Sequence, residues 1–186
     1  MAGFTEEAIR ESFLKLLEEH PLSSITVKEI VADCGINRNT FYYHFQDIPS
    51  LLERIIEDDC NRIISENTDP DSLESCLLMA AGLAENRRKQ ILHIYDSDDR
   101  QVFEAGLWKL CGYAVQAFLR GFFIKYNVGQ EQQDFLLRYY KGVCFGITME
   151  YLESGMSIDI RPYIRWLCAI KQGQIEELLE KMGSED

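Results

Sequence analysis

Two short helices with marked ends, separated by a turn of about three residues, constrain the fold of this chain more than any other feature. The segment TVKE, Thr26 to Glu29, matches a capping box, in which each residue's side chain accepts from the backbone N–H of the other. Gly35 can end this helix because glycine adopts a left-handed backbone at little cost, and Asn37 is a good N-cap for the next helix. This order predicts a helix-turn-helix.

The rest of the chain is expected to be helical as well. Apolar residues recur at spacings of three and four, whereas runs of alternating β-branched residues do not occur. The polar, proline-containing segment 65–72 is a clear break, and two long helices are expected at about 131–153 and 160–182. The sequence therefore predicts an all-α protein, with an N-terminal three-helix helix-turn-helix domain at 1–47 and a C-terminal helical bundle at 48–186.

The composition limits the partners. The chain has 186 residues, 46% of them apolar, and 19 basic against 31 acidic residues give a net charge of −12. Such a charge argues against general affinity for membranes or polyanions, so any contact with nucleic acid must be local. The N-terminus has no basic n-region, and no window reaches 18 uninterrupted apolar residues. We expect a cytoplasmic protein without a membrane partner, whose six scattered cysteines are free thiols.

The second helix of the pair carries two different faces. Phe41 and Phe45 lie four residues apart and share a face with Ile36, so they are expected in the core. The residues turned outward are Arg38, Asn39, Tyr42 and Tyr43. Arginine can bind guanine and asparagine can bind adenine bidentately in the major groove, while tyrosine and histidine can donate to phosphates. An alternative interpretation is that the exposed rings are ordinary surface or interface residues.

The segment from Thr26 to Leu52, TVKEIVADCGINRNTFYYHFQDIPSLL, resembles the DNA-binding signature of TetR-family transcriptional regulators. The resemblance covers about residues 5–56 and departs from the family pattern at Gln46 to Pro49, where many members have a lysine. It adds Thr26 and Lys28 as positions that often touch phosphate. The expected DNA-binding residues are Thr26, Lys28, Asn37, Arg38, Asn39, Thr40, Tyr42, Tyr43 and His44.

The resemblance also implies a homodimer on a double-stranded, near-palindromic operator and a C-terminal domain that binds a small molecule. Repression relieved by that ligand is the implied mode, although relatives with a similar segment act as activators or answer to a protein or metal partner. The expected ligand-binding residues are Tyr95, Phe103, Trp108, Phe122, Tyr139, Phe145 and Met149. Arg138 or Arg120 is a possible anchor for an anionic group. The alternative is that most of these rings are simply core.

The subunit interface is expected on the last two long helices. Gly142 and Gly146 lie four residues apart, and small residues at this spacing let another helix approach closely. The expected interface residues are Gly142, Gly146, Ile164 and Leu167. Close packing within one chain is the alternative.

The sequence gives no support for an enzyme, a cofactor or a metal. It contains no P-loop, no GxSxG, no HExxH and no glycine-rich nucleotide turn. The segment HIYDSDD places His93 near Asp96, Asp98 and Asp99, but without a defined ligand spacing. The rival to a DNA-binding regulator is a helical ligand-binding or protein-docking bundle with weak DNA affinity, because residues 1–62 carry more acidic than basic groups.

Overall fold

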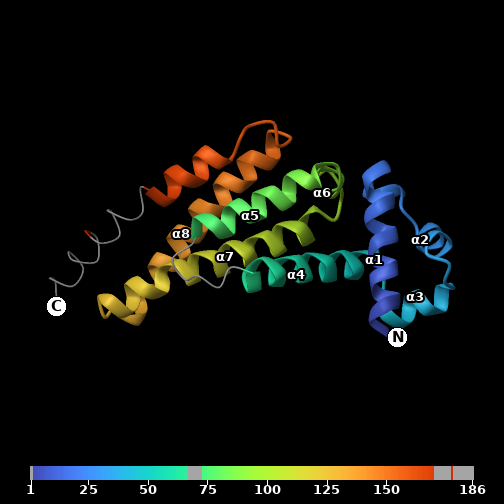
Figure 1. The fold of residues 1–186 in the computed structure, drawn as a ribbon, viewed down its shortest axis with the longest axis horizontal. Coiled ribbons are helices and arrows are strands. Elements are labelled where there is room, and N and C mark those ends of the chain that lie inside the picture. Colours follow the sequence, from blue (N-terminus) through green and yellow to red (C-terminus); the bar gives the residue numbers. More distant parts are fainter. Residues whose placement is uncertain (1, 67–72, 170–176, 178–186) are drawn as a thin grey trace. The chain divides into compact units, whose positions relative to one another are not determined.

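A computed structural model describes residues 2–66, 73–169 and 177 of the chain (Figure 1). Its elements are α1 (Ala2–Glu19), the 3-10 helix η1 (Leu22–Ser24), α2 (Val27–Asp33), α3 (Arg38–His44), α4 (Ile48–Glu66), α5 (Leu73–Asn86), α6 (Arg88–Tyr95), α7 (Arg100–Lys125) and α8 (Gln130–Glu153). Residues 161–169 form a further helix. These described ranges contain no strand, so the predicted all-α class is confirmed.

The chain divides into two compact units. Unit 1 consists of residues 1–60 and 86–106, and unit 2 consists of residues 61–85 and 107–186. The units therefore do not divide at residue 47, because residues 48–60 and 86–106 belong to the same unit as residues 1–47. Unit 1 contains the helix-turn-helix together with most of α4, all of α6 and the first turns of α7.

Helix α6 belongs to unit 1 because it lies against α1, although the two helices are far apart in the sequence. Its His93 donates through Nδ1 to the carbonyl oxygen of Leu17 at 2.7 Å, and Nε2 of Gln90 is 3.4 Å from the carbonyl oxygen of Leu14. His93, which was considered as a metal ligand, thus faces a backbone carbonyl. Sequence periodicity cannot reveal this contact, since it joins residues 76 positions apart.

The core of unit 1 is built from the apolar stripes of its helices. Helix α1 contributes Ile9, Phe13 and Leu17, all fully buried. The other buried members are Leu22, Ile25, Ile30, Val31, Phe41, Phe45, Leu51, Leu52, Ile55 and Ile94. These residues fix α2 and α3 to α1, so the helix-turn-helix has a rigid support of its own.

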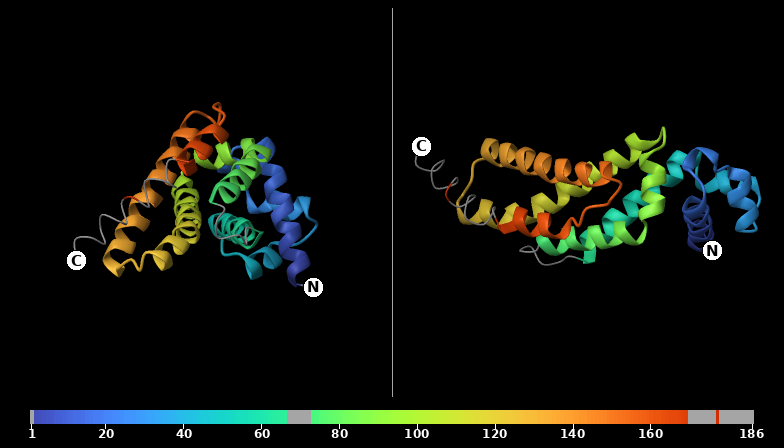
Figure 2. Two further views of the ribbon diagram at one scale, coloured as in Figure 1. Left: turned by 60° about the vertical axis from the view of Figure 1, so that its left-hand side comes forward. Right: turned by 90° about the horizontal axis from the view of Figure 1, so that it is seen from above.

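Unit 2 is built around α7 and α8. Figure 2 shows α8 turning back from the end of α7, and the two helices share a core with α5. The buried members are Ile63, Cys76, Cys111, Ala114, Val115, Phe118, Leu119, Val128, Leu136, Tyr140 and Cys144. None of the six cysteines forms a disulfide, as expected, and burial raises the pKa of the Cys76 thiol to about 11.

The two long C-terminal helices agree with the sequence where the structure describes them. Helix α8 begins one residue before the expected range 131–153 and ends with it. The chain then turns through Gly155 and Met156, which both have left-handed backbones with φ of 65° and 56°. Of the helix expected at 160–182, residues 161–169 are helical, and 170–176 and 178–182 lie outside the described residues.

Candidate nucleic-acid interface

Helix α2 begins with the capping box that the sequence predicts. The Glu29 N–H donates to the Thr26 hydroxyl at 3.3 Å, and the Thr26 N–H donates to the Glu29 carboxylate at 2.8 Å. The Thr26 hydroxyl also donates to this carboxylate at 2.7 Å. These hydrogen bonds hold the pKa of the Glu29 carboxyl below its usual value. The Thr26 hydroxyl has the larger effect and the Thr26 backbone N–H the smaller one.

Replacing Thr26 with alanine should lower the free energy of unfolding by about 1 kcal/mol, the usual cost of losing an N-cap. Because the folded-state pKa of Glu29 is lowered, its contribution is present above the unfolded-state pKa and is lost as pH falls through the folded-state pKa. The difference between wild type and variant should therefore shrink on acidification in urea denaturation. Ser23→Ala, an exposed control in η1, should change little, and an equal loss in both variants would contradict the capping role.

The turn between α2 and α3 depends on Gly35. Its φ of 71° is left-handed, and the next N–H, that of Ile36, donates back to the carbonyl oxygen of Val31 at 3.0 Å. Asn37 then caps α3, as its Oδ1 accepts from the Thr40 N–H at 2.9 Å and from the Thr40 hydroxyl at 3.1 Å. The predicted turn and cap are confirmed, and Figure 1 shows that α3 changes direction relative to α2.

The buried face of α3 anchors it to α1 and α2. Phe41 is fully buried and Phe45 is 8% exposed, with their ring centroids 5.9 Å apart. Ile36 packs against the same core. The predicted core role of these three residues is confirmed.

The opposite face of α3 presents polar groups and rings to solvent. Arg38 and Asn39 are exposed, Tyr42 is 55% exposed and Tyr43 is 83% exposed. Residues 38 and 42, and likewise 39 and 43, are four apart, so the four side chains form one patch over two helical turns. Among the described residues no carboxylate lies within 4.0 Å of the Arg38 guanidinium.

The two acidic residues of α2 both have partners. Glu29 is bound in the capping box, and the Asp33 carboxylate pairs with the Lys15 ammonium at 2.5 Å. That pair holds the pKa of Asp33 below its usual value. Lys28 is exposed and, like Arg38, has no carboxylate within 4.0 Å in the described ranges. Lys28 and Arg38 are thus exposed cations, although with Glu29 and Asp33 the formal charge of the helix-turn-helix segment sums to zero, on a chain with a net charge of −12.

His44 is a correction to the predicted DNA-binding set. Its side chain is only 7% exposed, and its Nδ1 lies 3.1 Å from Oε1 of Glu6 in α1. The ring is thus turned toward α1 and not outward with Tyr43. Helical periodicity cannot reveal this contact, because it joins residues 38 positions apart. Thr40 is half-buried with its hydroxyl on Asn37, whereas Asn37 and Thr26 are exposed beside the patch.

The seven residues expected to bind a ligand do not lie in one unit. Tyr95, which is buried, and Phe103 belong to unit 1, and the other five belong to unit 2. The Tyr95 ring lies under the Arg100 guanidinium at 3.9 Å. These two are therefore corrected to packing residues of unit 1.

The other five expected ligand residues have different surroundings. Phe122 packs against the core of unit 2, Met149 is half-buried and Tyr139 is 55% exposed. Trp108 contacts Phe145, with ring centroids 5.1 Å apart and an interplanar angle of 89°. Of the seven residues, Trp108 is the one that lines a groove between α7 and α8.

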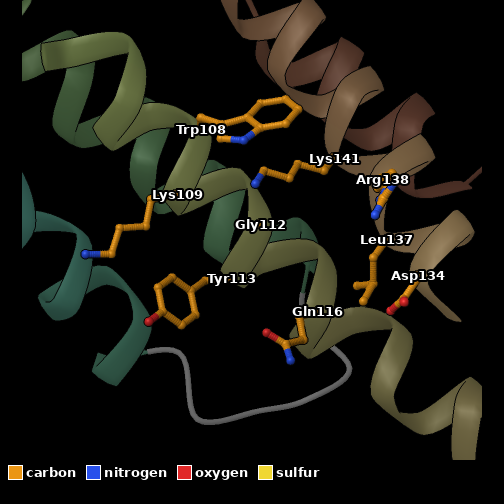
Figure 3. Close-up of a pocket in the computed structure, with 9 residues that line it drawn as sticks. All are labelled: Trp108, Lys109, Gly112, Tyr113, Gln116, Asp134, Leu137, Arg138 and Lys141. Carbon is orange, nitrogen blue, oxygen red and sulfur yellow. The ribbon is translucent and has the colours of Figure 1, made fainter. Parts of the chain in front are cut away.

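This groove has a volume of about 530 Å³ and is shown in Figure 3. It is lined by Trp108, Lys109, Gly112, Tyr113, Gln116, Asp134, Leu137, Arg138 and Lys141. The aromatic pattern of the sequence indicated Trp108, and Arg138 was noted as a possible anchor. Lys141 was missed, although its position three residues after Arg138 on one helix face was a usable signal.

The exposed side of α8 differs in part from the expected interface. Among the described residues, a Cβ added to Gly142 or Gly146 would meet nothing within 4 Å, so neither glycine serves close packing against that part of the chain. Ile164 is a correction, because it is 5% exposed and buried within unit 2, and Leu167 is half-buried. Two exposed aromatic pairs were not among the expected interface residues. They are Phe135–Tyr139 and Tyr163–Trp166, whose ring centroids lie 6.3 Å and 5.5 Å apart.

A helix-turn-helix whose second helix presents an exposed arginine beside exposed polar groups is the architecture of DNA-binding transcription regulators. Two family models match the chain, "Bacterial regulatory proteins, tetR family" over residues 9–55 and "Transcriptional regulator C-terminal region" over residues 71–173. The second match alone spans more than half of the chain. The chain belongs to the TetR family of transcriptional regulators, and it is not an enzyme.

Known proteins resemble this chain over different lengths. The HTH-type dhaKLM operon transcriptional activator DhaS of Lactococcus lactis subsp. lactis (strain IL1403) is 26% identical over 157 residues, or 83% of each chain. A solved structure of the dihydroxyacetone kinase operon activator DhaS shares the fold, with a TM-score of 0.76, 22% identity and coverage of 92% of this chain and 96% of that one. The uncharacterized HTH-type transcriptional regulator YxbF of Bacillus subtilis (strain 168) is 35% identical over 65 residues, 34% of this chain and 17% of that protein. In the part of the chain that the structure describes, no helix is long and apolar enough to cross a membrane.

Proposed function

We propose that this regulator binds a near-palindromic operator as a homodimer, with α3 of each copy in the major groove, and that a ligand in unit 2 changes its affinity for DNA. The observation that carries the proposal is the exposed patch of Arg38, Asn39, Tyr42 and Tyr43 above a fully buried Phe41. A packed underside keeps α3 rigid, so its outer groups can be placed against base edges without a large cost in conformational entropy.

The side chains of the patch are assigned to bases or to phosphates by the hydrogen bonds that each can make. Arg38 and Asn39, in the first turn of α3, are assigned to base edges, because they are the two side chains there that bind a purine bidentately. Tyr42 and Tyr43 are assigned to phosphates, together with Thr26 and Lys28. Few cations take part, so attraction to random DNA should be weak and its salt dependence shallow.

A second copy is proposed to pack against the open stripe of α8. Phe135, Tyr139, Gly142 and Gly146 follow one another at spacings of four, three and four, so they lie on one side of the helix. Both aromatic residues are more than half exposed, and both glycines leave open space. Exposed apolar groups gathered on one face are typical of a protein interface, and the glycines would let a partner helix approach closely.

The sign of regulation has two candidates. Family resemblance implies repression that a ligand relieves. The similarity to DhaS, whose name describes an operon activator, favours activation as the second candidate because it extends over 83% of both chains. Transcription in vitro from a promoter that carries the selected operator separates the two, since added protein lowers the yield of transcript in one case and raises it in the other.

The experiment that tests DNA binding uses a pool of randomised duplexes and the full chain, followed by sequencing of the retained duplexes. The proposal expects a motif with two inverted half-sites whose centres are separated by about one helical turn. Enrichment of no motif would favour the rival, a helical ligand-binding or protein-docking bundle with weak DNA affinity.

Tyr43→Phe should weaken binding to the operator and to random DNA by similar factors. It removes one hydroxyl donor to phosphate from each copy and leaves the ring in place, and a phosphate contact carries no sequence information. Tyr42→Phe should behave alike, and both can be followed by fluorescence anisotropy at fixed salt. A changed base preference in the Tyr42→Phe variant would show that this residue reads a base.

A further inference from the structure

The groove between α7 and α8 is cationic on a strongly acidic chain. Three basic residues and one acidic residue line it, whereas the whole chain has a net charge of −12. The acidic residue, Asp134, accepts from Nε2 of Gln130 at 3.0 Å. The lining of the groove thus carries a net positive charge. A positive site favours an anionic occupant, even on a chain whose overall charge repels anions.

Two of the basic groups have no internal counterion. Arg138 and Lys141 are three residues apart on α8, and in the described parts of the chain neither has a carboxylate within 4.0 Å. Like charges at this spacing destabilise a helix slightly. A bound anion would relieve that repulsion and accept hydrogen bonds from both groups.

The apolar wall of the groove is held next to these cations. The Lys141 ammonium lies 4.0 Å from the centre of the Trp108 ring, in a cation–π contact. Gly112 leaves room for this contact, because a Cβ there would lie 3.3 Å from both Cε and Nζ of Lys141 and the lysine would have to shift slightly. Figure 3 shows Lys141 reaching across Gly112 toward Trp108, with Arg138 and Leu137 further along the same groove.

We propose that this groove binds a small amphipathic anion, with its carboxylate or phosphate group between Arg138 and Lys141 and its apolar part against Trp108 and Leu137. The proposal gives the chemical class of the effector and rests on the proposed function only for the consequence on DNA. A neutral apolar ligand would leave the two cations uncompensated in a site from which water is partly displaced. A cationic ligand would meet like charge.

The test uses 4-phenylbutyrate as the probe, with 4-phenylbutanol and 4-phenylbutylamine as neutral and cationic counterparts of similar size. In a Trp166→Phe background Trp108 is the sole tryptophan, so its fluorescence reports binding at the groove. Phenylbutyrate should bind at least about tenfold more tightly than the alcohol, as expected for one charge-assisted hydrogen bond or more, and the amine should bind least. Absence of phenylbutyrate binding, or equal binding of the alcohol, would overturn the proposal.

Variants of the two cations locate the site. Arg138→Gln and Lys141→Gln should each weaken phenylbutyrate binding about tenfold, while Lys141→Arg should retain most of it. Arg120→Gln is the matched control, because Arg120 is exposed on α7, carries the same charge and does not line the groove. Circular dichroism checks that each variant stays folded. Equal weakening by Arg120→Gln would mean that only net charge matters, and the groove would not be the site.

The effect on DNA is measured separately. Operator affinity with and without phenylbutyrate must change by the same factor as phenylbutyrate affinity with and without operator. Phenylbutyrate that binds at the groove without altering operator affinity would leave the anion site intact and refute ligand control through it. A chain that binds phenylbutyrate but selects no DNA motif would refute the proposed operator binding alone.

Discussion

Replacing Arg38 with alanine is expected to abolish most of the preference for the selected operator over random DNA. A bidentate contact from arginine to guanine discriminates by about 1 to 3 kcal/mol, and a symmetric dimer would lose this contact in both half-sites, or about 2 to 6 kcal/mol in total. The loss should be confined to one position in each half-site. Competition binding against operators altered at every position measures both the size and the place of the effect.

Lys28→Ala is the matched control for this variant. Both residues are exposed cations of the helix-turn-helix, but Lys28 is assigned to phosphate. Its loss should weaken operator and random DNA alike and should reduce the salt slope by about one for each lost phosphate contact. An Arg38→Ala variant that keeps the base preference of the wild type would remove Arg38 from the reading of sequence.

Introducing leucine at Gly142 or Gly146 should convert the proposed dimer to monomer. Either side chain would project into space that no described residue of the single chain fills and that we assign to a partner helix. Glycine costs a helix about 1 kcal/mol relative to better helix formers, so both variants should keep or raise their helix content. Operator affinity should fall steeply, because a monomer contacts a single half-site.

Light scattering and circular dichroism together check this prediction. Gly121→Leu is the control, since a Cβ added to Gly121 would also meet no described residue within 4 Å, but Gly121 belongs to α7. It should remain dimeric. Dimers that persist in both the Gly142 and Gly146 variants would move the interface away from this stripe of α8.

The helix-turn-helix could be predicted almost completely because its determinants are local. The Thr26–Glu29 capping box and the Asn37–Thr40 cap each join residues three apart, and Gly35 acts through its own backbone conformation. Phe41 and Phe45 follow from helical periodicity alone. The same reasoning placed Arg38 and Asn39 outside, where the structure has them.

The remaining sites depend on contacts between distant residues, which periodicity does not specify. Periodicity shows that His44 lies beside Phe45, but only the packing of α1 brings Glu6 to its ring. Ile164 lies on an apolar stripe, but the pattern does not say whether its own chain or a partner covers it. Lys141 is an ordinary helix-surface residue until α7 places Trp108 under its ammonium group.

The most direct test of the central claim, that two copies of α3 read one face of an operator, is a change in half-site spacing. Inserting about five base pairs between the selected half-sites rotates one of them to the opposite face of the duplex. The account predicts that affinity for this operator falls close to the level for random DNA, while each half-site sequence stays intact. Unchanged affinity after the insertion would contradict it, since the two half-sites would then be bound independently.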